Sequence, residues 1–387
     1  MPKVVAIKDL RLAARRRLPK MVFDFIDGGA GDETTREANV ADFEKIRLAP
    51  RMMVDVSKRD MAIELFGEKL RAPIVLSPIG LTGLSTPKGE LDAARAAKAA
   101  GIGYCLSTNS SASIEELAAA TGKPFWFQLY VMKDRELSRS MMQRAKAAGC
   151  NVLVVTVDLA AAGRRERDIR NGFTVPPKIS VGDALNAALH PGWLYRTLTG
   201  PRLTFANYQT GADRGFLDLA KHVSDSFDPA LSWKDIEWMK SVWGGPVVIK
   251  GILRADDAER AIQSGADGIS VSNHGGRQLD GVPSSIAALP SIAERVSGRV
   301  PVLIDGGVRR GLDIIRAKAL GATAVLIGRA FVYGLAAMGP QGAARAIDML
   351  TTELDNAMAL LGTPVFRDIG RDVLADDGAS AGWPRNG

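Results

Sequence analysis

The segment Ser272–Gln278, which reads Ser-Asn-His-Gly-Gly-Arg-Gln, holds residue types that together could do chemistry on a small acid. It places His274, one of three histidines in the chain, three residues before Arg277. A histidine can take up a proton near neutral pH, and an arginine can hold a carboxylate with its two-pronged guanidinium. The two glycines between them let a ligand approach the backbone closely. The segment predicts a site that binds a small acid and deprotonates it; a solvated loop after a strand is the alternative.

Other polar residues stand where strand-like apolar runs end. Lys250 ends the run Val247–Lys250, and a buried lysine needs an anionic partner. It could form a structural ion pair, or act as a Schiff-base nucleophile as in an aldolase. The carboxyl ends of barrel strands share one face. The residues expected to meet there are Pro78, Ile79, Gly80, Ser107, Gln128, Tyr130, Thr156, Asp158, Lys250, His274 and Arg277.

The last two strand-like runs end in glycines and arginines. One gives Asp305, Gly306, Gly307 and Arg309, and the other gives Gly328 and Arg329. In a barrel of alternating strands and helices these two loops form the usual phosphate site. Glycine N–H groups combined with arginines suit a phosphate dianion.

Eight apolar runs separated by helix-like segments indicate an α/β fold, the TIM (β/α)₈ barrel. A doubly wound open sheet is the alternative, but no Gly-x-Gly-x-x-Gly follows the first strand. The predicted strands are Pro73–Pro78, Gly103–Thr108, Phe125–Tyr130, Asn151–Asp158, Pro246–Gly251, Gly268–Asn273, Pro301–Gly306 and Ala324–Arg329. The predicted helices are Glu90–Ala100, Ile114–Ala120, Ser138–Ala148, Ala255–Ser264 and Ile286–Val296.

The whole chain, residues 1–387, is predicted to be a single domain. A helix around Leu10–Asp27 forms an N-terminal extension that closes one end of the barrel. The long gap after the fourth strand predicts an insertion over residues 160–231, a lid or accessory surface. Within it, Val181–Leu198 could be an amphipathic interfacial helix, or a helix packed on the barrel or on another subunit. Residues 376–387 are small and polar, which predicts a flexible tail.

Composition narrows the class of protein. With 387 residues, 46% of them hydrophobic and 24% charged, the chain is typical of a soluble globular protein. Its net charge of +7 comes without a nucleic-acid-binding motif, so we expect no nucleic-acid partner and instead anionic substrates, a cofactor phosphate or a membrane surface. Cys105 and Cys150 are expected to be buried reduced thiols. No signal sequence or membrane span is predicted, which favours the cytoplasm, and no metal site is expected.

With these motifs assembled, the chain resembles the FMN-dependent (S)-2-hydroxy acid oxidase and dehydrogenase family. The resemblance extends from about Leu18 to about Gly362. It rests on Ser-Asn-His-Gly-Gly-Arg-Gln-Leu-Asp at 272–280, Asp-Gly-Gly-Val-Arg-Arg-Gly at 305–311 and Phe-Gln-Leu-Tyr at 127–130. It implies that the chain oxidises a 2-hydroxy acid to a 2-oxo acid with FMN as cofactor.

The resemblance also implies roles for the residues at the strand ends. The backbone of Pro78, Ile79 and Gly80 would line the flavin ring, and Lys250 would stabilise negative charge at its N1 and O2 edge. Hydrogen bonds to the flavin would come from Ser107, Gln128 and Thr156. The ribityl phosphate would be held by Asp305, Gly306, Gly307, Arg309, Gly328 and Arg329.

For the substrate, Arg165 and Arg277 would clamp the carboxylate, and Tyr130 would add a hydrogen bond. His274 would be the general base, with Asp158 stabilising its protonated form; electrons would leave as a hydride or from a carbanion. Many relatives have tyrosine where this chain has Phe25, so one hydrogen bond to the carboxylate would be absent and the pocket more apolar.

L-lactate, giving pyruvate, is the substrate that the resemblance favours. (S)-Mandelate or another bulky acid is the alternative, as is an oxygen-using oxidase that makes hydrogen peroxide. Gly80 and the long insertion resemble features of quinone-linked, membrane-associated dehydrogenases, which favours a quinone acceptor and a peripheral position on the inner face of the cell membrane. Family precedent also implies a homotetramer. The other classes considered are a Schiff-base aldolase using Lys250 and a non-catalytic flavin-binding or membrane-scaffold protein.

Overall fold

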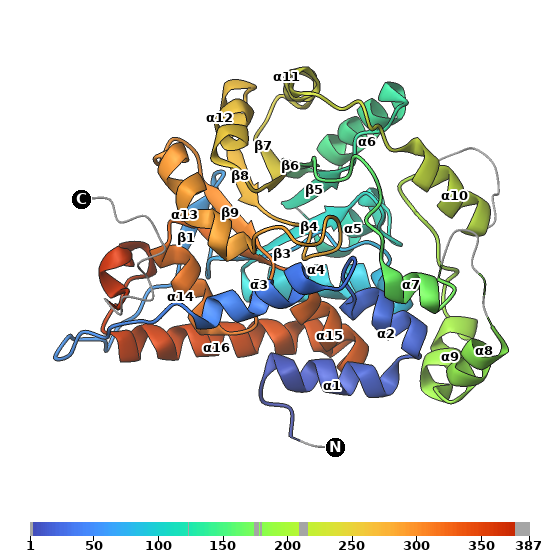
Figure 1. The fold of residues 1–387 in the computed structure, drawn as a ribbon, viewed down its shortest axis with the longest axis horizontal. Coiled ribbons are helices and arrows are strands. Elements are labelled where there is room, and N and C mark those ends of the chain that lie inside the picture. Colours follow the sequence, from blue (N-terminus) through green and yellow to red (C-terminus); the bar gives the residue numbers. More distant parts are fainter. Residues whose placement is uncertain (1–2, 123, 174–177, 179, 209–215, 376–387) are drawn as a thin grey trace.

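The fold is a closed barrel of eight parallel strands surrounded by helices (Figure 1). The computed structural model describes residues 3–122, 124–173, 178, 180–208 and 216–375. Around the barrel the strand order is β10-β3-β4-β5-β6-β7-β8-β9, which confirms the predicted (β/α)₈ architecture. The strands are β3 (Ile74–Leu76), β4 (Gly103–Ser107), β5 (Phe125–Leu129), β6 (Cys150–Thr156), β7 (Val247–Ile252), β8 (Gly268–Val271), β9 (Val302–Asp305) and β10 (Ala324–Ile327).

All eight predicted strands are present, each within a few residues of its expected bounds. Nearly every strand residue is buried, as expected when helices cover one face of a sheet and side chains fill its interior. Cys105 and Cys150 are buried free thiols in two of these strands, as predicted. Neighbouring strands keep a parallel register, so Ser107 lies opposite Gln128 and Thr156 opposite Lys250. This register brings the polar residues at the strand ends to one face.

The outer helices follow from capping and amphipathic patterning. Ser113 caps α5, Asp134 caps α6 and Ser284 caps α13, each through a side-chain oxygen that accepts from backbone N–H groups. The five predicted helices are present. The outer helices are α4 (Gly89–Ala100), α5 (Ile114–Thr121), α6 (Arg135–Ala147), α11 (Trp233–Trp243), α12 (Ala255–Gln263), α13 (Ser285–Val296), α14 (Gly311–Ala319), α15 (Arg329–Met338) and α16 (Gly342–Leu361).

The N-terminal extension differs from the single helix predicted over residues 10–27. It forms α1 (Ile7–Arg17) and α2 (Lys20–Asp27), because Pro19 breaks the helix; α3 (Thr34–Glu44) follows. Helix α1 packs along α15 outside the barrel rather than closing an end. The amino ends of the strands are instead met by the hairpin of β1 (Ile63–Leu65) and β2 (Glu68–Leu70), whose turn residue Phe66 packs on Trp126.

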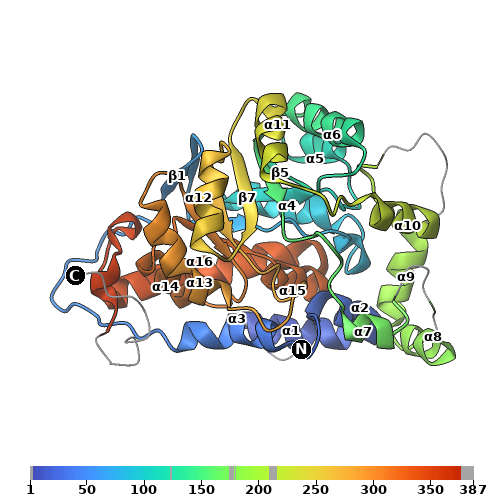
Figure 2. The same ribbon diagram turned by 45° about the horizontal axis from the view of Figure 1, so that its top comes forward.

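The insertion after the fourth barrel strand is present as predicted and contains helices that lie to one side of the barrel (Figure 2). They are α7 (Glu166–Arg170), α8 (Val181–Ala188), α9 (Pro191–Thr199) and α10 (Phe216–Ser226). The expected single helix over 181–198 is wrong, since Pro191 starts a second helix and has no N–H to continue the first. Neither α8 nor α9 has a buried residue. The predicted flexible tail, residues 376–387, lies outside the described residues.

Candidate active site

The predicted site residues gather around one cavity of about 200 Å³ at the carboxyl ends of the strands. Residues from most of the strand ends, from α2 and from the insertion line it together. The predicted residues among them are Phe25, Pro78, Ile79, Gly80, Ser107, Tyr130, Arg165, Lys250, His274, Arg277, Asp305, Gly306, Gly307, Arg309, Gly328 and Arg329. The cavity therefore combines a histidine, several cations and glycine-rich backbone in one place.

His274 is held between a carboxylate and a phenol. Its Nδ1 lies 2.8 Å from Oδ1 of Asp158, and its Nε2 lies 3.3 Å from the hydroxyl of Tyr130. The φ angle of His274 is +57°, a left-handed conformation that is rare for residues other than glycine and that concentrates at functional sites. The imidazole therefore presents Nε2 toward the cavity while Asp158 fixes its orientation.

Asp158 itself lies behind the cavity wall, in close contact with neighbouring residues. The Cβ of Asp158 packs so near Gly251 that a side chain at 251 would collide with it, and Gln278 donates to its backbone carbonyl. Burial disfavours its charge, but His274 and the hydrogen bond from that ring outweigh burial, so the pKa of Asp158 lies below its usual value. Burial raises the pKa of Tyr130 to about 12, so its hydroxyl keeps its proton at neutral pH. The arrangement suits proton uptake by His274.

Arg277 is a buried cation held mainly by backbone carbonyls. Its guanidinium donates to the carbonyl oxygens of Phe25 (2.7 Å) and Gly28 (2.9 Å) and lies 5.2 Å from the centre of the Phe25 ring. Burial and the nearby charge of Arg165 hold the pKa of Arg277 well below its usual value, with Asp168 compensating only in part. A cation in this position gains most from an anion that enters the cavity, and a substrate carboxylate would be such an anion.

Lys250 is also buried but has a fixed counter-ion. Its Nζ lies 2.8 Å from Oδ2 of Asp305 and donates to Oγ of Ser272, which also accepts the N–H of His274. Burial alone would lower its pKa, but the carboxylates of Asp305 and Asp158 outweigh it and raise the pKa. A protonated amine has no lone pair for carbonyl attack, so this geometry disfavours the Schiff-base alternative.

The far end of the cavity suits a phosphate. Gly328 precedes α15, and no side chain caps that helix, which leaves its first N–H groups for an anion. Burial, together with the nearby positive charge of Arg309, lowers the pKa of Arg329. The backbone at Gly307 approaches Asn39 so closely that any side chain would collide with its carbonyl oxygen.

The residues along the cavity fit the FMN that the sequence predicts. Nε2 of Gln128 and Oδ1 of Asp305 are buried polar atoms without a hydrogen-bond partner among the described residues. They are a donor and an acceptor of the kind that a flavin ring and a ribityl hydroxyl would pair with. Lys250 adds positive charge, and the phosphate end adds N–H groups and Arg309. The donor set therefore matches an aromatic ring joined to a polar arm with a terminal phosphate.

Four predicted residues take positions that the sequence could not specify. Gln128 lies behind the wall and is paired with Ser107 (3.2 Å). Thr156 borders a second cavity of about 270 Å³ that shares only Tyr130 with the first. Asp158 contacts the cavity only through His274. The guanidinium of Arg329 is engaged by the carbonyls of Ile26, Gly28 and Gly275.

Sequence analysis missed the residues that hold the site loops from behind. Asn39 and Asn273 exchange two hydrogen bonds of 2.8 Å, which join α3 to the loop that carries His274. Asp280 accepts from the N–H groups of Thr34 and Thr35 at the start of α3. Asp27, fully buried, binds side chains from four other helices. For Asp27, the sequence offered one signal, namely an acidic residue inside the apolar run that ends at Gly28.

Comparison with known proteins agrees with the FMN-binding character of the cavity. The model of the FMN-dependent dehydrogenase family matches residues 14–376. The L-lactate dehydrogenase of Actinobacillus pleuropneumoniae serotype 5b (strain L20) is 47% identical over 376 residues, covering 96% of this chain and 98% of the relative. That of Stenotrophomonas maltophilia (strain R551-3) is also 47% identical, covering 96% and 99%.

Two solved structures are similar in fold and sequence. The crystal structure of the monotopic membrane protein (S)-mandelate dehydrogenase has a TM-score of 0.94 at 39% identity, covering 97% of this chain and all of that one. Mandelate oxidase with (S)-4-hydroxymandelic acid has a TM-score of 0.82 at 41% identity, covering 94% and 96%.

Proposed function

The chain belongs to the FMN-dependent dehydrogenase family, and we propose that it oxidises L-lactate to pyruvate. The observation that carries this proposal is the juxtaposition of a buried, incompletely compensated Arg277 with the His274–Asp158 pair in one cavity. Arg277 would take the carboxylate of a 2-hydroxy acid and His274 a proton from it. The 47% identity to L-lactate dehydrogenases over almost the full chain supports lactate as the substrate.

The chain's own residues would divide the work as follows. Arg277 and Arg165 bind the carboxylate and orient the substrate, and the neutral hydroxyl of Tyr130 holds the substrate oxygen. His274 accepts a proton at Nε2, and Asp158 stabilises the imidazolium. When bound in this cavity, FMN would supply the two-electron oxidising chemistry that these residues serve.

For the cofactor, we propose that Pro78, Ile79 and Gly80 face the flavin ring through their backbone and that Lys250 supports its polar edge. Ser107, Gln128 and Thr156 would provide hydrogen bonds. The phosphate would lie on the N–H groups that start α15, between Gly307, Gly328 and Arg309. This assignment is supported by the unpaired atoms of Gln128 and Asp305.

We further propose a peripheral position on the inner face of the cell membrane, with a quinone as electron acceptor. The side chains on α8 and α9 support it, because large apolar residues are exposed there: Val181 (80%), Leu185 (64%), Leu189 (77%), Tyr195 (69%) and Leu198 (74%). Such a surface can lie in a lipid interface. None of the helices in the described part of the chain is long and apolar enough to cross a membrane. The monotopic membrane protein (S)-mandelate dehydrogenase is similar over 97% of this chain.

Family precedent supports two more parts of the proposal, a homotetramer and a single catalytic domain over residues 1–387 that includes the insertion at 160–231. The assembly can be checked by light scattering of the purified protein. A monomer at working concentration would refute the tetramer.

(S)-Mandelate or another bulky 2-hydroxy acid is the second candidate substrate. The specific observation in its favour is Phe25, whose ring lines the cavity and lies 5.0 Å from Phe173. An aromatic ring at this wall, backed by a second ring, would suit an aromatic side chain better than a methyl group.

The deciding experiment is an anaerobic visible spectrum of the FMN-loaded protein, before and after L-lactate or (S)-mandelate is added to separate samples. Bleaching of the flavin band by L-lactate is the expected result. Bleaching by (S)-mandelate alone would transfer the assignment to the bulky substrate. A protein that neither acid reduces would refute both substrates, and peroxide formed in air would identify an oxidase.

The membrane proposal has its own test. A variant lacking residues 181–198 should stay in the soluble fraction, whereas the full chain should sediment with anionic vesicles. Equal sedimentation of the two proteins would refute the role of α8 and α9, and an unchanged flavin spectrum of the variant shows that the barrel is intact.

A further inference from the structure

The end of α2 supplies backbone acceptors to both buried arginines of the cavity. Arg277 donates to the carbonyls of Phe25 and Gly28, and Arg329 donates to those of Ile26 (3.0 Å) and Gly28 (2.7 Å). Residues 25, 26 and 28 thus form a small platform that sets where two cations point. The position of these carbonyl groups sets how the guanidinium of Arg277 is oriented toward a carboxylate that enters the cavity.

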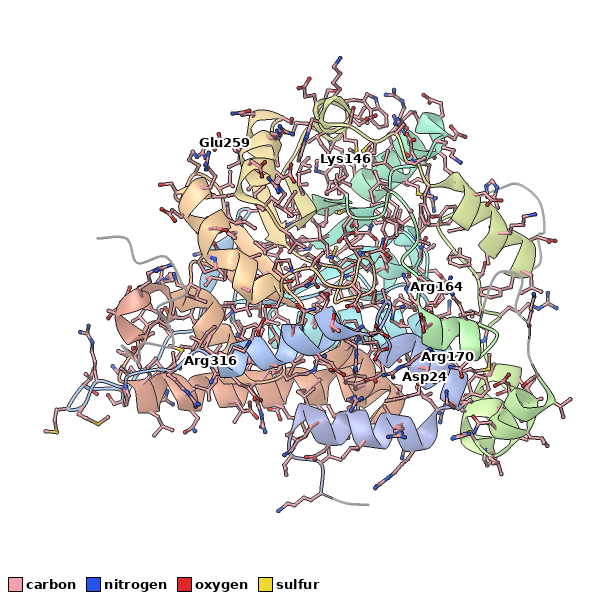
Figure 3. All side chains as sticks on the ribbon, viewed as in Figure 1. Asp24, Lys146, Arg164, Arg170, Glu259 and Arg316 are labelled. Atoms are coloured by element: carbon pink, nitrogen blue, oxygen red, sulfur yellow. The ribbon has the colours of Figure 1, made fainter. Side chains whose placement is uncertain are left out.

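Asp27 lies between these residues in the sequence, but its side chain contacts a different set of partners. Its Oδ1 accepts from Nε of Arg11 and from the hydroxyl of Tyr333, both at 2.6 Å, and its Oδ2 accepts from Arg11 (2.8 Å) and Arg167 (3.3 Å). These partners belong to α1, α15 and α7, and Arg36 of α3 lies 3.6 Å from Oδ2, so one carboxylate joins four helices to the end of α2. The packing of α2 on α7 can be followed from the labelled Asp24 and Arg170 in Figure 3.

From these contacts we infer that Asp27 is a positioning residue for the substrate carboxylate and acts through the backbone of residues 25–28 on Arg277. The inference rests on the proposed function, because Arg277 is its substrate-binding group. The side chain of Asp27 is fully buried and is not among the residues that line the cavity; its effect is to hold the carbonyls that orient the guanidinium.

The charge of Asp27 is required as well as its shape. Burial opposes ionisation, but the hydrogen bonds from Arg11 and Tyr333 outweigh it and hold the pKa of Asp27 well below its usual value. With a neutral amide at this position, Arg11 loses its carboxylate partner, Arg36 and Arg167 lose one of theirs, and one amide NH₂ group faces guanidinium donors that it cannot accept from. The end of α2 should then shift, and the carbonyl platform with it.

The test compares Asp27→Asn with the wild type, both loaded with FMN. The probe is oxalate, a small dicarboxylate with no hydrogen on carbon to lose, and its dissociation constant is measured by calorimetry. We expect this constant to rise roughly 10- to 100-fold, the range that the loss of one hydrogen bond to a charged group can produce. With the substrate, KM should rise by a similar factor while kcat changes little, a split that general loss of folded protein would not give.

Asp24→Asn is the matched control. Asp24 lies one turn earlier on α2, is similarly buried, and shares Arg167 with Asp27, but its other partners are Lys20 and Asn171 rather than Arg11 or Tyr333. Its oxalate constant should stay within about twofold of the wild type. If Asp27→Asn does not fold, Arg11→Gln removes the two-pronged partner from the outside of the same contact, and it should raise the constant in the same direction.

The outcomes separate this inference from the proposed function. An Asp27→Asn protein that retains FMN and binds oxalate with the wild-type constant would overturn the role of Asp27, as would a wild-type constant in Arg11→Gln if the first variant is unfolded. A wild-type protein that binds oxalate but is not reduced by L-lactate would overturn the proposed substrate, and the oxalate comparison would still decide the role of Asp27.

Discussion

Replacing Asp158 by Asn should slow the chemical step and leave substrate binding almost unchanged. Oδ1 of Asp158 lies 2.8 Å from Nδ1 of His274, and the carboxylate does not line the cavity. When His274 takes a proton, it gains a positive charge next to this carboxylate. Two unit charges about 4 Å apart attract by about 4 kcal/mol at the effective dielectric constant of a protein. Because about 1.4 kcal/mol corresponds to tenfold in rate, the full charge is worth about 10³.

An asparagine has the shape of the aspartate, and its oxygen can still accept the Nδ1–H of the ring. Part of the stabilisation is therefore retained, and we expect flavin reduction to slow by about 10²- to 10³-fold, with KM within about threefold of the wild type. The assay is anaerobic stopped-flow at saturating and limiting substrate. Asp257→Asn, which removes a carboxylate that borders the second cavity, is the control and should reduce at nearly the wild-type rate. A rate within threefold of the wild type in Asp158→Asn, or a loss confined to KM, would refute the reasoning.

Three further predictions concern other parts of the site. His274→Gln should keep its FMN and lose flavin reduction by more than about 10²-fold in the same stopped-flow assay, since general-base removal typically costs this much or more; reduction at the native rate would exclude His274 as the base. Phe25→Tyr should lower the KM for L-lactate by about tenfold or more, because a hydrogen bond to a charged group contributes about 1.5–3 kcal/mol; an unchanged KM in steady-state kinetics would show that position 25 does not reach the carboxylate. Asp27 has a pKa below its unfolded value, so its contribution to stability is present above pH of about 4 and is lost as the pH falls below that value. Thermal unfolding between pH 3 and 7 should therefore show a shallower acid decline for Asp27→Asn than for the wild type, and equal slopes would contradict the assignment.

The barrel could be predicted from sequence because its signals are local and repeated. Each strand is a short apolar run and each outer helix has a cap or an amphipathic face, so the eight strands fall close to their expected bounds. The two wrong helix predictions share one cause. Pro19 and Pro191 each start a new helix inside a segment whose apolar pattern continues, and the pattern alone cannot register that break.

The residues that line the cavity could likewise be predicted from the sequence, because strand ends in a barrel converge on one face whatever the details of packing. The contacts that support these residues from behind could not be predicted. The Asn39–Asn273 pair joins residues 234 positions apart, and the Asp27–Tyr333 hydrogen bond joins residues 306 apart. Such pairs depend on how α1, α2, α3 and α15 pack around the barrel, and no periodicity or spacing in the sequence encodes that packing.

Lys250 and Arg277 are both buried cations at the cavity, but the charge of Lys250 is paired within the fold, whereas that of Arg277 is left for a ligand. Lys250 is neutralised by a carboxylate, so its charge is satisfied within the fold. Arg277 is hydrogen-bonded to carbonyl oxygens, which accept its N–H groups but carry no net charge. Folding has therefore already removed water from Arg277 without cancelling its field, and an entering carboxylate meets a cation that needs little further desolvation. The carboxylate of Asp168 offsets this field only in part, and Asp27, at the end of α2 that supplies the carbonyls, pairs with Arg11 and Tyr333.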